Sequence, residues 1–180
     1  MPREKTTLTL LLAGAGDGRA GWAVAEWLAG WAEVRSDVDA RLVDLADHPP
    51  PRGPARSPVT RDALPTRLAE ADAVVVVTAD HHGGMTAELK NAVERSADRW
   101  AGKPVGFVSY GGGHAVACLG QVMRGVDAVV AGAVEVTGAT SEALAGHVEA
   151  VSALMDVLAW WGRELRWART GTTQTVKGCA

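Results

Sequence analysis

Short apolar runs alternate along this chain with longer segments whose apolar residues recur at helical spacing. The clearest run is Val74–Val77, four valines in succession, which is typical of a central parallel strand covered by helices on both faces. From Met85 onward the spacing is helical, with Leu89, Ala92 and Val93 on one stripe. By the same criteria the pattern predicts strands at Thr6–Leu12, Val38–Leu45, Val74–Val77, Val105–Ser109 and Ala128–Val136.

The segments between these strands carry helical patterns or turn residues. The first helix is predicted from Trp22 to about Val34, and the last from Ser141 to about Arg169 without a break. Residues 46–60 contain five prolines and no periodicity, and they form an irregular excursion because the sheet pattern resumes after them. We therefore expect one domain over residues 1–169 and a disordered tail over residues 170–180.

Strands that alternate with helices predict an α/β fold with a parallel sheet and right-handed crossovers. We expect a doubly wound five-stranded sheet in the order 2-1-3-4-5, with helices on both faces. In this order strands one, three and four are neighbours, and their carboxyl-end loops converge at the point where the strand order reverses. The glycine-rich loops of the chain follow these same three strands, which predicts a ligand site at that edge.

Each of the three loops carries residues suited to binding. The first, Ala13–Gly21, leads from a strand into a helix and so offers free backbone N–H groups to an anion, although its glycine spacing matches neither GxGxxG nor a P-loop. The second, Ala79–Gly84, adds an aspartate and two histidines to two glycines. The third, Tyr110–His114, places three glycines between an aromatic residue and a histidine.

Composition narrows the possible partners. A net charge of −3 gives no basic footprint, so we expect neither nucleic acid nor an anionic membrane as a partner. No apolar run approaches the roughly 20 residues of a membrane span, and the start of the chain lacks the pattern of a signal peptide. Cys118 and Cys179 form no metal or redox motif, so a cytoplasmic location is expected.

Three stretches carry a resemblance to a known family: ADAVVVVTADHHGGMTAELKNAVE from Ala71 to Glu94, WAGKP from Trp100 to Pro104, and SYGGG from Ser109 to Gly113. They resemble the NADPH-dependent FMN reductase family, a flavodoxin-like group of flavin oxidoreductases, and the resemblance runs from Leu8 to about Thr137. It implies a flavodoxin-like fold, FMN as cofactor, NAD(P)H as co-substrate and a homodimer. In that family the first loop holds the FMN phosphate, and the other two bracket the isoalloxazine ring.

The resemblance also implies which residues bind the cofactor. They are Gly14, Ala15, Gly16, Arg19 and Ala20 in the first loop, Ala79, Asp80, His81, His82 and Gly83 in the second, and Ser109, Tyr110, Gly111, Gly112 and His114 in the third.

This chain departs from the family pattern in the first two loops. Both serines of the family's G-S-x-R-x-x-S are alanine, and its arginine position is Asp17, so Arg19 is the candidate to replace the lost phosphate contact. In the second loop Asp80 stands where the family has glutamate, and Thr86 stands where it has its second proline. Ala79, His81 and His82 replace the family's proline, tyrosine and asparagine.

His81 and His82 are the candidate catalytic residues. An imidazole titrates near neutral pH and could donate a proton to the substrate or stack near the ring; the alternative is that both are simply exposed loop residues. A metal site built from Asp80, His81, His82 and His114 is disfavoured because adjacent histidines diverge, and we expect no metal. Tyr110 either covers the flavin or nicotinamide or packs on its own loop.

The favoured function is an FMN-dependent NAD(P)H oxidoreductase that reduces a quinone, a free flavin or another small organic acceptor. The first alternative is a divergent member without tight flavin binding that acts as a ligand-binding or partner protein. The second is a non-redox enzyme that uses the histidine-rich pocket. Tryptophans cluster in two predicted helices, where core packing is favoured over a subunit interface; they are Trp22, Trp27, Trp31, Trp160, Trp161 and Trp167.

Overall fold

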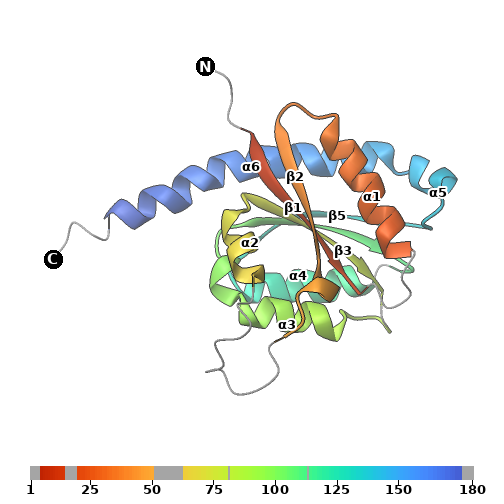
Figure 1. Cartoon of the computed structure of the whole chain (residues 1–180), viewed down its shortest axis with the longest axis horizontal. Coiled ribbons are helices and arrows are strands. Elements are labelled where there is room, and N and C mark those ends of the chain that lie inside the picture. The colour runs from red at the N-terminus through yellow and green to blue at the C-terminus, as the bar shows by residue number, and fades with distance from the viewer. Residues whose placement is uncertain (1–4, 15–19, 51–62, 81, 113, 176–180) are drawn as a thin grey trace.

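The computed structural model describes residues 5–14, 20–50, 63–80, 82–112 and 114–175. In this part of the chain five parallel strands form one sheet in the order β2-β1-β3-β4-β5, which confirms the predicted fold class and strand order (Figure 1). The strands are β1 Thr6–Ala13, β2 Val38–Asp44, β3 Ala73–Ala79, β4 Pro104–Tyr110 and β5 Val129–Val136.

The central position of β3 explains its unbroken apolar run. Every residue from Ala73 to Thr78 is buried, because β3 is paired on both edges and covered on both faces. The outer strand β2 instead alternates between buried and more exposed positions, with Val38 and Val43 turned inward. A continuous apolar run therefore marks a central strand, and an alternating pattern marks an outer strand, as expected.

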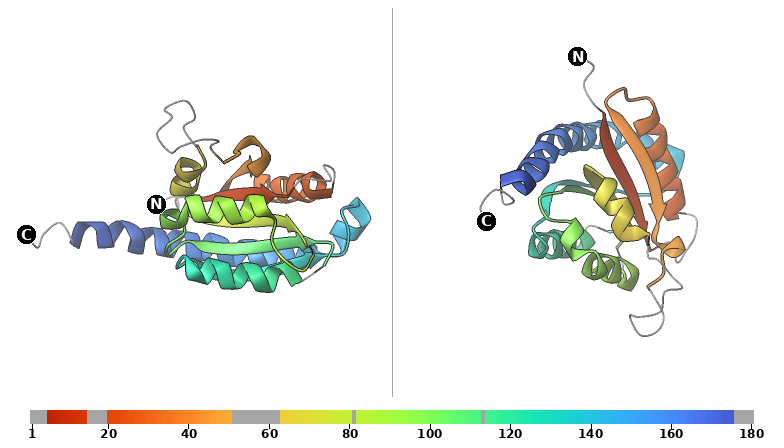
Figure 2. Two further views of the ribbon diagram at one scale, coloured as in Figure 1. Left: turned by 90° about the horizontal axis from the view of Figure 1, so that it is seen from below. Right: turned by 60° about the vertical axis from the view of Figure 1, so that its left-hand side comes forward.

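Helices cover the sheet in two layers (Figure 2). The core of one face combines inward residues of β1 and β3, such as Leu10 and Val75, with α1 Ala20–Glu33, α5 Ser141–Ala145 and α6 Val148–Thr175. The core of the other face contains Val74 and Phe107 together with α2 Leu64–Glu70, α3 Ala87–Arg95 and α4 His114–Gly125. Short 3-10 turns, η2 Leu45–Asp47 and η3 Ala97–Arg99, follow β2 and α3.

The C-terminal helix differs from its prediction in two ways. It is broken at Gly146 and His147, whose backbone N–H groups donate to the carbonyls of Ala143 and Leu144; His147 Nε2 accepts the backbone N–H of Thr137 at 3.3 Å. Apolar spacing continues across that break, so the sequence pattern conceals it. Helix α6 also continues to Thr175, whereas the sequence predicts a disordered tail over residues 170–180; residues 176–180 lie outside the described part.

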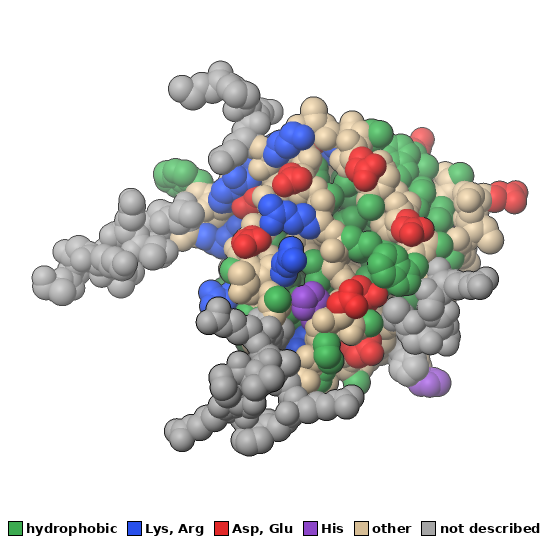
Figure 3. Space-filling model, viewed as in Figure 1, with side chains coloured by type: hydrophobic (Ala, Val, Ile, Leu, Met, Phe, Trp, Pro, Cys, Tyr) green, Lys and Arg blue, Asp and Glu red, His purple; other side chains and the backbone are tan. Residues whose placement is uncertain are grey.

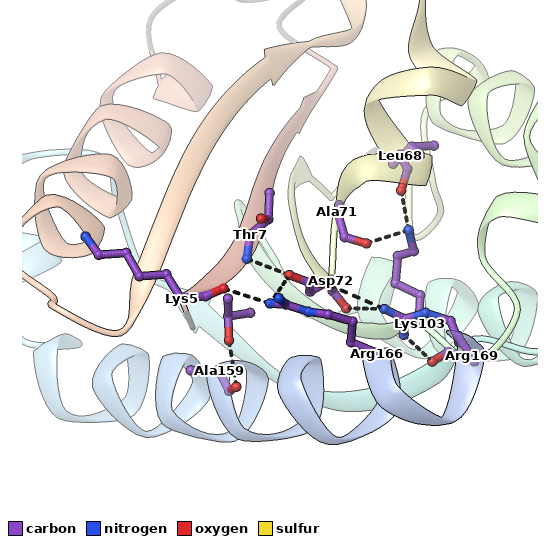
Figure 4. Close-up of polar contacts among 11 residues, drawn as sticks. Lys5, Thr7, Leu68, Ala71, Asp72, Lys103, Ala159, Arg166 and Arg169 are labelled. Atoms are coloured by element: carbon purple, nitrogen blue, oxygen red, sulfur yellow. Dashed lines mark hydrogen bonds and ion pairs between the residues drawn. The ribbon is translucent and has the colours of Figure 1, made fainter. Parts of the chain in front are cut away.

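A polar cluster fastens α6 to the amino ends of the strands (Figure 4). Asp72 Oδ2 accepts the backbone N–H of Thr7 at 2.8 Å and lies 2.5 Å from Arg166 Nη2. One helical turn further on, Arg169 Nη1 donates to the carbonyl of Gly102 at 2.9 Å. Figure 3 shows Lys and Arg side chains gathered toward the end of the molecule where α6 projects, with acidic side chains among them.

Lys103 is buried beside this cluster. Its Nζ donates to the carbonyl of Leu68 in the last turn of α2 and, at 2.8 Å, to that of the C-cap residue Ala71. Burial lowers the pKa of Lys103 to about 8, and Arg169 adds to the lowering. The turn before β4 is thus held by a lysine that covers the end of a neighbouring helix.

Several tryptophans are not in the core, which corrects part of the sequence interpretation. Trp160 and Trp167 on α6 are 51% and 80% exposed, and Trp22 on α1 is 37% exposed. Trp27 does pack against the α1 face of the core. Trp160 lies on the outward side of α6, because its neighbours Ala159 and Gly162 face the sheet at Thr6.

Candidate functional site

Three loops meet at the carboxyl edge of the sheet. β1 ends beside β3, with Ala13 paired to Thr78, and β3 ends beside β4, with Ala79 paired to Tyr110. Because all three strands run in the same direction, the loops that follow them leave from one edge. The convergence predicted from the sequence is therefore present in the fold.

Gly14 joins the first loop to the second. Its φ of +83° belongs to the left-handed region, and an ideal Cβ there would lie 2.5 Å from Cγ2 of Thr86. Thr86 in turn caps α3, because its Oγ1 accepts the backbone N–H of Leu89 at 3.3 Å. In the family comparison Thr86 is only a departure from a proline, but a threonine just before a helical stripe is also a recognisable cap signal.

The first turn of α1 follows the first loop in the chain. Helix α1 begins at Ala20, and its first turn contains no acidic side chain. The amide groups there have no acceptor within the helix and so suit an anion. Ala15, Gly16 and Arg19 belong to residues 15–19, which lie outside the described residues.

Tyr110 packs inward toward α1. Its ring lies against the core of the α1 face, and an ideal Cβ on Gly21 would lie 2.6 Å from its phenolic oxygen. The same Cβ would lie 3.1 Å from Cδ1 of Leu12. Gly21 therefore leaves the space that Tyr110 occupies, and this contact joins the third loop to the start of α1.

Asp80 joins the second loop to the third. Its Oδ1 accepts the backbone N–H of Gly83 at 2.8 Å, while its Oδ2 accepts those of His114 at 2.9 Å and Ala115 at 3.3 Å. Its own backbone N–H donates to the carbonyl of Tyr110 at 2.9 Å. The carboxylate is therefore occupied by protein donors from two loops.

Burial tends to raise the pKa of Asp80, but the three backbone N–H groups and the nearby His114 outweigh it, so this pKa is lowered. The His114 imidazole is 87% exposed, and its Nδ1 lies 3.6 Å from Asp80 Oδ2. The pair thus consists of a carboxylate enclosed by backbone and an imidazole turned toward solvent.

The second loop bends sharply after Asp80. His82 has a φ of 53° and Gly83 a φ of 77°, both in the left-handed region, and both residues are exposed. His81 lies outside the described residues, so only His82 of the two candidate catalytic histidines is located. Its exposure at the edge of the sheet leaves it accessible to a small molecule.

The third loop exposes mainly backbone, rather than side chains, at the carboxyl edge of the sheet. Gly111 has a φ of +82°, and a Cβ there would meet no atom within 4 Å, whereas a Cβ on Gly112 would lie 2.8 Å from Asp80 Oδ2. Ser109 is fully buried, and its Oγ has no hydrogen-bond partner in the described part of the chain. The Ser109 side chain consequently does not reach the surface of this edge.

The described residues fit a flat molecule with a phosphate tail. The start of α1 offers amide groups to a phosphate, and the backbone at Gly83 and Gly111 can be approached closely, since an ideal Cβ at either meets nothing nearer than 3.9 Å. Within the described ranges no group of three or more His, Cys, Asp or Glu side chains is arranged to hold a metal ion. Among the helices that the structure describes, none has the length and apolar character needed to cross a bilayer.

A protein-family model described as NADPH-dependent FMN reductase matches residues 6–143. A relative from Schizosaccharomyces pombe, named an NAD(P)H-dependent FMN reductase, is 32% identical over 109 residues, which cover 55% of this chain and 54% of that protein. The chain thus spans about half of the length of the curated relatives it matches, or less.

Solved structures share the fold. FerB from Paracoccus denitrificans, described as a flavoenzyme NAD(P)H:(acceptor) oxidoreductase, superposes with a TM-score of 0.66 at 18% identity, covering 89% of this chain and 98% of FerB. Megasphaera elsdenii flavodoxin superposes with a TM-score of 0.62 at 16% identity, covering 84% of this chain and 98% of the flavodoxin. At such identities the likeness establishes a flavodoxin-like architecture.

Proposed function

Because this chain belongs to the NADPH-dependent FMN reductase family, we propose that it is an NAD(P)H-dependent oxidoreductase with FMN as its cofactor. The observation that carries the proposal is the set of contacts joining all three loops at one edge of the sheet. Gly14 packs on Thr86, Asp80 binds the start of α4, and Tyr110 lies over Gly21. A site made of loops that support one another suits a large, flat cofactor.

In this proposal the chain holds FMN mainly through its backbone. The first turn of α1, from Ala20, would bind the phosphate, and the backbone at Gly83 and Gly111 would lie against the ring. When bound, FMN accepts hydride equivalents from a nicotinamide and passes electrons to an acceptor. The protein's own part is to hold both molecules and to exclude unwanted acceptors.

His82 is the described residue that we propose as a proton donor to the reduced acceptor. It is exposed on the second loop, and Gly83 beside it lies near the start of α4, where a Cβ on Gly83 would be 3.9 Å from Cβ of His114. An imidazole can supply a proton near neutral pH. His81 carries the same proposal from the sequence alone, since it lies outside the described residues.

We propose a quinone, a free flavin or another small organic molecule as the acceptor. The names of the relatives support this range: one is an FMN reductase, and FerB is described only as acting on an acceptor. A cytoplasmic location is part of the same proposal. It is supported by the proposed use of NAD(P)H and by Cys118, which forms no disulfide with any residue that the structure describes.

A homodimer is also proposed. Val157, Trp160 and Trp167 on α6 are exposed, and large exposed apolar side chains mark protein contacts. Sedimentation or light scattering of the full chain should give the mass of a dimer, and Trp160→Glu should shift that mass toward the monomer. A monomeric wild-type protein would remove this part of the proposal.

The second candidate is a divergent member without tight flavin binding. The sequence favours it at one point, since alanine replaces both serine positions of the first loop and so removes two hydroxyl donors to a phosphate. Such a protein would bind another ligand or partner at the same edge. A non-redox enzyme using the histidine-rich loop is the remaining alternative from the sequence.

FMN binding decides between these functions. The purified protein should show a flavin spectrum or, after flavin removal, quench its tryptophan fluorescence when titrated with FMN; Trp22 on α1 is a suitable reporter. It should then oxidise NAD(P)H in the presence of a quinone. A protein that neither binds FMN nor oxidises NAD(P)H refutes the proposal.

Two variants refine the test. His82→Ala should lower turnover with little change in FMN affinity, whereas Arg19→Ala should weaken FMN binding if Arg19 has replaced the missing phosphate contacts. Arg41→Ala serves as a control, because Arg41 lies on the outer strand β2 in an exposed ion pair with Glu70.

A further inference from the structure

The Asp80 carboxylate lies at the junction of two loops and is almost enclosed. Its side chain is 7% exposed, although it sits at the edge of the sheet where neighbouring residues are open to solvent. Oxygen Oδ1 binds within the second loop, at the N–H of Gly83, while Oδ2 binds the N–H groups of His114 and Ala115 at the start of α4. One side chain thus connects the loop after β3 to the start of α4.

Gly112 closes the remaining side of this carboxylate. A Cβ on Gly112 would lie 2.8 Å from Asp80 Oδ2 and 3.2 Å from its Cγ, so only glycine allows the third loop to approach this closely. Its φ of +139° is a conformation that side-chain-bearing residues rarely adopt. The third loop is therefore shaped to pack on Asp80.

The chemistry of the donors keeps the carboxylate charged. Three backbone N–H groups point at it, and hydrogen bonds to an ionised acceptor are stronger than those between neutral groups. The lowered pKa of Asp80 agrees with this geometry. An asparagine of the same size keeps one acceptor oxygen but places an NH2 group against N–H donors.

We propose that Asp80 is a positioning residue that joins the second loop to the third and so fixes how the backbone at Gly83 is placed relative to the backbone at Gly111. The inference rests on the proposed function in one respect, namely that the FMN ring lies against the backbone at Gly83 and Gly111. Asp80 acts through the backbone of both loops, and His114 contributes its amide N–H to this lock between the two loops and leaves its imidazole in solvent.

The hydrogen bonds between Asp80 and the two loops can be tested without any cofactor. Hydrogen exchange of the apo protein, followed by NMR, should show the amides of Gly83, His114 and Ala115 exchanging about tenfold faster in Asp80→Asn, because each loses its charged acceptor. The urea midpoint is measured alongside, to separate local opening from loss of the whole fold. Unchanged exchange at all three amides would overturn the proposal.

A matched control uses the same substitution elsewhere. Asp44, the last residue of the outer strand, also accepts a backbone N–H from its own connecting segment, since its Oδ1 accepts the N–H of Ala46 at 2.9 Å. Asp44→Asn should speed exchange at Ala46 only, and should leave the three loop amides and FMN affinity as in wild type.

FMN titration then links the lock to the site. Asp80→Asn should weaken FMN binding about tenfold, while Asp80→Glu, which keeps the charge and both acceptor oxygens, should recover most of it. His114→Ala retains the backbone N–H and should change affinity less than about threefold, as expected for an exposed ion pair. If His114→Ala weakens binding as much as Asp80→Asn, the imidazole itself is the contact and the backbone lock is refuted.

The two hypotheses fail separately. A wild-type protein that binds no FMN refutes the proposed function, and the exchange experiment still decides whether Asp80 joins the loops. A wild-type protein that binds FMN, beside an Asp80→Asn variant with normal exchange and normal affinity, refutes the positioning role and leaves the proposed function intact.

Discussion

The phenolic oxygen of Tyr110 occupies the place that a side chain on Gly21 would need, 2.6 Å from its ideal Cβ. This contact joins the loop after β4 to the first turn of α1, across the edge where the site lies. It makes Gly21 a packing requirement, because glycine is otherwise a poor residue for a helix.

Gly21→Ala should therefore destabilise the protein, although alanine favours helices. The new methyl group must displace Tyr110 or Leu12, and overpacking of this kind costs roughly 1–3 kcal/mol. Gly30→Ala in the same helix is the matched control, because a Cβ there meets nothing within 4 Å and should stabilise the protein by about 1 kcal/mol. Urea unfolding of both variants measures the difference; equal stabilities would contradict the observed packing.

Gly111→Ala should affect both stability and FMN affinity. Its φ of +82° should cost an alanine roughly 1–2 kcal/mol, and its Cβ would enter the open space at the edge where we propose that the ring lies. Gly102→Ala carries a similar backbone penalty at a φ of +64°, but at the opposite edge, near Arg169. Denaturation and FMN titration should show that both lose stability and that only Gly111→Ala loses affinity. Equal FMN affinity in the two variants would place the ring elsewhere.

Lys103 should make stability rise with pH in the alkaline range. Burial lowers its pKa from 10.5 to about 8, so between these values the unfolded chain holds a proton that the folded chain has released. The contribution of Lys103 to the free energy of unfolding is therefore fully present above pH 10.5 and is lost as the pH falls through 8. The loss between these two pH values is about 3 kcal/mol. A neutral amine still has donors for the carbonyls of Leu68 and Ala71.

Urea unfolding between pH 7 and 10.5 measures this slope. Lys103→Met should flatten it relative to wild type, whereas Lys90→Met, which removes an exposed lysine on α3, should leave it in place. Parallel curves for wild type and Lys103→Met would show that Lys103 does not titrate in this range.

The sequence by itself determined the architecture of this protein. Runs such as Val74–Val77 and the alternation in Val38–Leu45 distinguish a covered strand from an outer one, and the glycine-rich loops follow the strands that become neighbours. These features are local, because strand periodicity and turn chemistry depend on residues close together in the chain. The edge of the sheet that carries the loops followed from strand direction alone.

Only the tertiary structure decided what the side chains of those loops do. Asp80 was a ligand candidate in the sequence, yet it binds backbone N–H groups of a loop more than 30 residues away, and Tyr110 turned toward Gly21. Thr137 and His147 meet at the break before α6, and Trp160 is exposed because its neighbours Ala159 and Gly162 are the positions of α6 that contact Thr6. Such outcomes depend on the partner that the folded chain brings near, and no local spacing records that partner.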